Sequence, residues 1–184
     1  MSKKRGKSLR SILVREVQQR LTEVFLEKGF SPVPLRSEEL NSEMKAAFPL
    51  GRLKRKRGNK LDVVEFQFDS YRRLSFVINF GIVPEEGVTV PWAGHIEQDV
   101  AGPVWPDDYR LYSSSFRMRW FKLGLFSLQN EKAISRLVDR AIALSGEINN
   151  WFESGTVGKH MRQSPPFPTM QQIRDAGGKT VAPP

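Results

Sequence analysis

The sequence contains no cysteine, and His95 and His160 are its only histidines. Without cysteine, the chain can form no disulfide, use no thiolate nucleophile and bind no metal through sulfur. A glycine-rich phosphate loop is also missing, because the Gly-Gly-Lys step at 177–179 follows no strand pattern and opens no helix pattern. We therefore expect neither a cofactor nor a metal site.

Long hydrophobic runs are absent as well. The first 20 residues are positively charged like a signal peptide, but Arg15 and Glu16 interrupt the apolar residues before a hydrophobic core segment can form. No later stretch approaches the length of a membrane span. These features predict a cytoplasmic protein without a membrane span.

Positive charge is abundant and unevenly distributed. Residues 1–60 hold 16 Lys and Arg against 6 Asp and Glu, a net charge of +10, whereas residues 61–184 hold 13 against 14. Such an excess attracts polyanionic partners over long range, although it says nothing about the fold. It is compatible with nucleic-acid binding and also with ordinary solubility.

The length of 184 residues and the 39% hydrophobic content fit one folded domain. Residues 1–8 are a basic head that we expect to be flexible. Residues 9–152 carry the periodic patterns of a single domain, and residues 153–184 are rich in Pro and Gly and lose periodicity. We expect this tail to be poorly ordered.

Helical periodicity occurs towards both ends of the predicted domain. Ser8 or Ser11 can cap a helix whose apolar residues, from Val14 to Phe25, recur every three or four positions until Gly29 ends it. A second long helix is predicted over 131–152. Between them, the pattern predicts a shorter helix that begins at Ser37.

A basic hairpin follows. Six basic residues and no acid lie between Arg52 and Lys60, and Gly58-Asn59 predicts a two-residue turn that sets Arg52 opposite Glu65 and Arg55 opposite Asp62. In this register Leu53 shares the buried face with Val64, Phe66 and Phe68. The other face, which we expect to be solvated, carries Arg52, Lys54, Lys56, Glu65 and Gln67. Exposed pairs on such a face contribute only tenths of a kcal/mol.

Two further strands are predicted. In residues 73–83, Phe76, Ile78 and Phe80 alternate with outward residues that include Asn79. In residues 113–124 the apolar Phe116, Met118 and Trp120 alternate with Arg117 and Arg119. The segment between these strands is rich in Pro and Gly, which argues against regular elements.

These elements predict an α+β fold in two layers. An antiparallel sheet of about four strands would have the N-terminal and C-terminal helices packed on one face. The opposite face would be polar and mostly cationic. Its candidate ligand-binding residues are Arg52, Lys54, Lys56, Glu65, Gln67, Asn79, Arg117 and Arg119, and Trp92, Trp105 and Tyr109 of the long loop are candidates to stack on a ligand.

Each of these features has a plainer explanation. A solvent-facing sheet normally carries Lys, Arg, Gln and Asn, and Gln67 and Asn79 can simply form a cross-strand amide hydrogen bond. Aromatic residues of the strands share the buried face, which disfavours stacking of single-stranded RNA on the sheet. His95, Glu97 and Asp99 alternate in a short acidic loop, a pattern that arises easily by chance and is weak support for a metal.

Several short motifs resemble those of a bacterial domain-of-unknown-function family, number 4304. They are the helix end "EKGF", the strand "VEFQFDS" and the strand "FVINFGIVP", with Gly29, Gln67, Asn79 and Gly81 among the matching positions. The resemblance spans about 9–151. It implies a compact α+β domain without an established activity.

From the sequence we favour a non-enzymatic binding module that engages an anionic partner, protein or nucleic acid, through the outward sheet face and the long loop. The alternative is a small-molecule or phosphoester enzyme that uses Glu65, Gln67, Asn79 and Arg117 in a groove on the same face. A pocket beneath the loop would favour the enzyme, and a flat basic face would favour the binder.

Overall fold

The computed structural model describes residues 8–36, 42–70, 73–90, 94–101, 108–116, 118–123 and 130–163. Its helical elements are α1 (Leu9–Glu16), the π-helical turn η1 (Val17–Leu21), α2 (Thr22–Leu26), α3 (Ser42–Ala47) and α4 (Glu131–Ser154). Its strands are β1 (Ser31–Val33), β2 (Arg52–Arg57), β3 (Lys60–Phe68), β4 (Ser75–Val83), β5 (Val88–Val90), β6 (Gly94–Ile96), β7 (Tyr109–Leu111), β8 (Phe121–Lys122) and β9 (Met161–Gln163). No helix in these ranges has the length and apolar character that crossing a bilayer requires.

Seven strands form one antiparallel sheet in the order β1-β2-β3-β4-β7-β9, with β8 also paired to β4, while β5 and β6 form a separate hairpin. The predicted combination of helices with an antiparallel sheet is confirmed. The predicted number of about four strands is wrong. Strands β1, β7, β8 and β9 contain only two or three residues each, too few for twofold alternation to be visible in a sequence.

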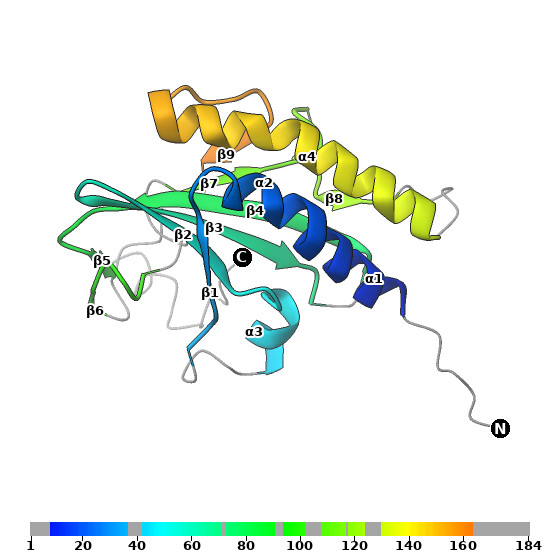
Figure 1. The fold of residues 1–184 in the computed structure, drawn as a ribbon, viewed down its shortest axis with the longest axis horizontal. Coiled ribbons are helices and arrows are strands. Elements are labelled where there is room, and N and C mark those ends of the chain that lie inside the picture. Colours follow the sequence, from blue (N-terminus) through cyan, green and yellow to red (C-terminus); the bar gives the residue numbers. More distant parts are fainter. Residues whose placement is uncertain are drawn as a thin grey trace, which may run out of the picture.

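The helices α1, α2 and α4 lie on one side of the sheet (Figure 1). The main core forms between these helices and the sheet face that carries Val64, Phe66, Phe76, Ile78 and Phe80, all of which are buried. Each of these positions follows the twofold alternation of its strand. The predicted inward orientation of Phe76, Ile78 and Phe80 is therefore confirmed.

The N-terminal helix begins at its predicted cap and ends as predicted. The Ser8 side chain accepts a hydrogen bond from the Ser11 backbone N–H, and Gly29 has a φ of 85°, in the left-handed region. Its buried positions differ in part, because Leu13, Val17, Leu21 and Phe25 are buried whereas Val14 is only partly so. These buried residues recur every four positions. They stay on one face of the helix because the π-helical turn η1 has more residues per turn than an α-helix.

The second face of the sheet is covered too, on the side where α3 and the β5–β6 hairpin lie (Figure 1). A small apolar cluster unites Leu61, Val63 and Val83 of the sheet with Ala101, and Val88 and Ile96 of the hairpin pack against it. The predicted solvated second face is therefore wrong. The prediction of an irregular segment after Pro84 is wrong over β5 and β6, whose strands are too short to outweigh the nearby Pro and Gly signals.

The register of the basic hairpin is confirmed, including Arg52 opposite Glu65 and Arg55 opposite Asp62. The expectation of solvated pairs is wrong. Asp62 is fully buried, receives hydrogen bonds from Arg55 Nε (3.0 Å) and Arg57 Nε (2.6 Å), and lies on the helix-covered face. The Arg55 guanidinium also lies 4.7 Å from the ring centroid of Phe30. The hydrogen bond to Asp62 raises the pKa of Arg57 above its usual value.

The predicted strand over 113–124 is wrong over most of its length. Phe116 is 86% exposed, Met118 has a φ of 41°, and Ser114 pairs with Arg119 in an isolated bridge around a tight turn. The core position is taken by Phe121 of β8, whose ring stacks on Phe76 at 5.1 Å between centroids. The alternation of apolar and basic residues in the turn resembled that of a strand by coincidence.

The helix predicted over 131–152 is confirmed as α4, with Asn130 as its cap. The sheet continues beyond the domain boundary that we predicted at 152, because β9 pairs with β7 and buries Met161. The chain reaches β9 through a contact with α4, in which the backbone N–H of His160 donates to Glu147 Oε2 at 2.9 Å and its ring Nδ1 lies 2.5 Å from Glu147 Oε1. Residues 164–184 of the predicted tail lie outside the described residues, as do 1–7 of the basic head and the predicted start of the short helix at Ser37.

Candidate functional site

A row of polar residues crosses the second face of the sheet from strand to strand. Arg52 of β2 lies opposite Glu65 of β3, Glu65 opposite Asn79 of β4, Asn79 opposite Arg110 of β7, and Arg110 opposite Arg162 of β9. Directly opposed side chains on one sheet face have Cβ atoms about 5 Å apart. We call these five residues the polar row.

The first pair of the polar row is an ion pair that is almost completely shielded from water. Arg52 Nε lies 2.5 Å from Glu65 Oε1, and the two side chains are 9% and 2% exposed. Desolvating two charges is costly, and their attraction and hydrogen bonding offset this cost only when both are present. The Glu65 carboxylate therefore acts as the counter-charge of Arg52.

Asn79 is the middle of the row and is only 1% exposed. Its Nδ2 donates to Gln67 Oε1 at 3.1 Å, whereas its Oδ1 is buried without a hydrogen-bond partner. The plainer prediction, a cross-strand amide hydrogen bond between Gln67 and Asn79, is confirmed. The cation of Arg110 opposite favours this amide orientation, because it attracts the carbonyl oxygen and repels the NH₂ group.

Arg110 was not among the residues predicted from the sequence. It is partly buried, and its Nε is buried without a hydrogen-bond partner. Glu65 is two strands away, a separation of about 10 Å at the usual strand spacing, and is engaged by Arg52. The signal in the sequence that could have identified Arg110 is the stretch Tyr109-Arg110-Leu111-Tyr112, in which one basic residue lies among apolar and aromatic residues.

Arg162 closes the polar row at the edge strand and makes hydrogen bonds to backbone carbonyls. Its Nη1 donates to Met161 O at 2.6 Å, and its Nη2 donates to Ser115 O at 2.7 Å. These contacts hold its guanidinium against the backbone carbonyls of Met161 and Ser115. The register places Arg162, a second cationic residue, opposite Arg110.

The remaining predicted candidates are dispersed. Lys54 Nζ donates to Asp99 O at 2.6 Å, Lys56 is exposed, and Arg119 is exposed in the tight turn. Tyr109 lies on the helix-covered face, where its ring is 5.0 Å from that of Trp151, so it does not belong to a loop above the polar row. Arg117, Trp92 and Trp105 lie outside the described residues. The structure thus brings together Arg52, Glu65, Gln67 and Asn79 of the predicted set.

The side chains of His95, Glu97 and Asp99 do not converge as the ligands of one metal ion would. His95 Nε2 lies 3.6 Å from Glu97 Oε1, but the Asp99 carboxylate faces Arg36, whose Nη2 is 3.2 Å away. Within the described ranges no group of three His, Asp or Glu side chains is arranged to hold a metal ion.

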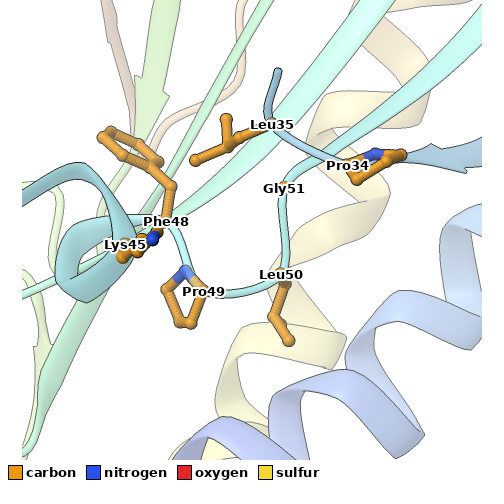
Figure 2. Close-up of a pocket in the computed structure, with 7 residues that line it drawn as sticks. All are labelled: Pro34, Leu35, Lys45, Phe48, Pro49, Leu50 and Gly51. Carbon is orange, nitrogen blue, oxygen red and sulfur yellow. The ribbon is translucent and has the colours of Figure 1, made fainter. Parts of the chain in front are cut away.

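A pocket of about 400 Å³ lies beside α3, and none of its lining residues belongs to the polar row (Figure 2). It is lined by Pro34, Leu35, Lys45, Phe48, Pro49, Leu50 and Gly51. Its walls are mainly apolar, and Lys45 contributes a charged side chain to the lining. The pocket could accept an apolar group, but it offers few directional contacts.

Comparison of the chain with protein-family models, curated proteins and solved structures gives no match. The resemblance to family 4304 stays a prediction. Function must therefore be argued from the geometry of the site, where Arg110 and Asn79 are opposed in the sheet and the Nε of one and the Oδ1 of the other are buried without hydrogen-bond partners.

Proposed function

We propose that this protein is a binding module that holds an anionic group of its partner on the second face of the sheet, with Arg110 as the principal contact. The observation that carries the proposal is the buried, unpartnered Nε of Arg110 in a row that holds three arginines and one glutamate. A guanidinium is always charged in proteins and donates in a planar fork that suits carboxylate and phosphate groups.

The energetic cost of burying Arg110 supports this proposal. A cation that is partly removed from water without a counter-charge destabilises the folded state. Glu65 cannot neutralise Arg110 because it is paired with Arg52 and separated by a strand. Asp108, two residues earlier, adds a second buried carboxylate near this end of the sheet, so the arginines still exceed the acids by one. An anion bound at Arg110 would relieve this imbalance.

The site favours a single protruding or small anion over a flat polyanion. Asn79 is almost completely buried, and Lys54 is held by a backbone carbonyl, so the described part of the second face presents no continuous stripe of exposed cations. The phosphoester-enzyme alternative would use Glu65, whose Oε1 is taken by Arg52. The geometry therefore supports binding better than acid–base catalysis.

The proposal is tested with Arg110→Gln and with Arg119→Gln, a matched control that removes the same charge from an exposed turn. Inorganic phosphate and acetate are titrated at constant ionic strength, and the midpoint of thermal unfolding is measured. We expect the anions to raise the midpoint of the wild type and of Arg119→Gln but not of Arg110→Gln.

A second result is expected without any anion. Arg110→Gln should be as stable as the wild type, or more stable by up to about 1 kcal/mol, because it removes a partly buried charge whose Nε has no hydrogen-bond partner. If the wild type does not respond to either anion, or if Arg110→Gln responds as strongly, the proposal is wrong.

A further inference from the structure

We infer that the anionic group bound here carries a hydrogen-bond donor, either on itself or on the adjacent atom; this inference rests on the proposed function and specifies its ligand. It is drawn from Asn79, which contributes an acceptor to the site next to the donor of Arg110. The ligand class consists of hydroxycarboxylates, amino acids and protonated phosphate groups. Acceptor-only anions such as acetate and sulfate should bind at the same site but more weakly.

The acceptor of Asn79 is fixed by its neighbours on both sides. Gln67 Oε1 takes the Nδ2 hydrogen bond at 3.1 Å, which leaves Oδ1 as the free atom of the amide. Turning the amide over would direct an NH₂ group at the guanidinium of Arg110, which lies opposite in the register. The oxygen is therefore held towards the side where the anion binds.

Burial makes the acceptor selective. Asn79 is 1% exposed, and Val77, on the same face two residues earlier, is fully buried, so Oδ1 is shielded from water that could satisfy it. An acceptor-only anion would satisfy Arg110 Nε but would set its own lone pairs against Oδ1. A ligand O–H or N–H would instead satisfy Oδ1, and sites that hydrogen-bond such a group reject analogues that lack it.

Two matched pairs of probes test the inference. Glycolate differs from acetate by one hydroxyl group next to the carboxylate. At pH about 8, inorganic phosphate is mainly a tetrahedral dianion that still carries one O–H, whereas sulfate is a tetrahedral dianion without one. Dissociation constants are measured by isothermal titration calorimetry at constant ionic strength.

For the wild type, we expect at least one donor-bearing probe to bind about tenfold more tightly than its partner, the loss that one unsatisfied buried acceptor produces. Preference for glycolate alone would indicate a hydroxycarboxylate or amino acid, and preference for phosphate would indicate a phosphate group. In Asn79→Leu the preference should fall to within about twofold, while the affinity for acetate or sulfate is kept.

The outcomes separate the two proposals. Equal affinities within both pairs in the wild type, together with loss of binding in Arg110→Gln, would overturn this inference and leave the proposed function standing. Absence of binding for all four probes would overturn both. If Asn79→Leu does not fold, Asn79→Asp serves instead: it keeps the acceptor but adds a negative charge, so it should weaken all four probes, and unchanged affinities would contradict the placement of Oδ1 at the site.

Discussion

At the scale of the residue, Arg52 and Glu65 show how burial changes the consequence of a charge pair. Their register follows from the hairpin turn, but the exposed fractions of 9% and 2% depend on what covers the sheet. An exposed pair contributes tenths of a kcal/mol, whereas removing one member of a buried pair leaves a desolvated charge. Substitution of one member of the pair should therefore change the free energy of unfolding much more if the pair is buried than if it is exposed.

We expect Arg52→Ala to lower the free energy of unfolding by about 3 kcal/mol or more, because Glu65 would remain buried without its cation. Urea unfolding at neutral pH measures this change. Lys56→Ala is the matched control, since Lys56 lies on the same face of the same strand but is exposed, and its effect should stay within about 0.5 kcal/mol. Equal effects for the two variants would show that the Arg52 pair is solvated.

At the scale of the element, β9 is one of the short strands that periodicity did not predict. Its three residues pair with all three of β7, and Met161 is 1% exposed in the main core. The contacts of Glu147 with the backbone N–H and ring of His160 join α4 to the start of this strand. The strand thus supports β7, which carries Arg110.

We expect a chain that ends at Ser154 to be less stable than a chain that ends at Gln163 by at least about 2 kcal/mol. The shorter chain loses the buried side chain of Met161 and leaves the edge of β7 unpaired. Chemical denaturation of both chains measures the difference. Met161→Ala in the longer chain should reproduce part of it, and identical midpoints for all three chains would contradict the role of β9.

At the scale of the whole molecule, the net charge of +9 and its concentration in residues 1–60 raise the question of polyanion binding. Much of this charge is engaged: Arg52 pairs with Glu65, Arg55 and Arg57 with Asp62, and Lys54 with a carbonyl. We call Arg52, Lys54 and Lys56, the basic residues that the sequence places on the outward face of β2, the stripe. Of these three residues, Lys56 alone is exposed. The stripe therefore offers few sites for phosphate groups.

We expect Lys54→Ala/Lys56→Ala to leave the salt dependence of DNA and RNA binding unchanged. If both lysines bound phosphates, their removal would reduce the slope of log affinity against log salt by about two, or about one for each lysine. A salt titration of an oligonucleotide by fluorescence anisotropy measures the slope. A chain that begins at Leu9 is the comparison, and disappearance of weak binding in that chain would assign it to the basic head. A slope reduced by about two in the double variant would instead restore the stripe as a binding surface.

The sequence by itself determined the elements that have a residue pattern extending over many neighbouring positions, or a cap or turn residue of strong backbone preference. The cap at Ser8, the left-handed Gly29, the turn at Gly58-Asn59 and the alternation of β3 and β4 follow from backbone preferences and from the twofold or helical period. These features fixed the register of Arg52 with Glu65 and the outward orientation of Asn79. They supplied three of the five residues of the polar row, Arg52, Glu65 and Asn79.

Only the tertiary structure decided what those residues do. Arg110 and Arg162 lie in strands of three residues, whose pairing depends on contacts between distant segments, so no local period reveals them. The burial of Asn79 and Glu65 likewise depends on what packs over the second face of the sheet, which alternation alone leaves open. Register is a property of neighbouring strands, whereas desolvation is a property of everything packed above them, and it is desolvation that makes Arg110 and Asn79 a candidate site.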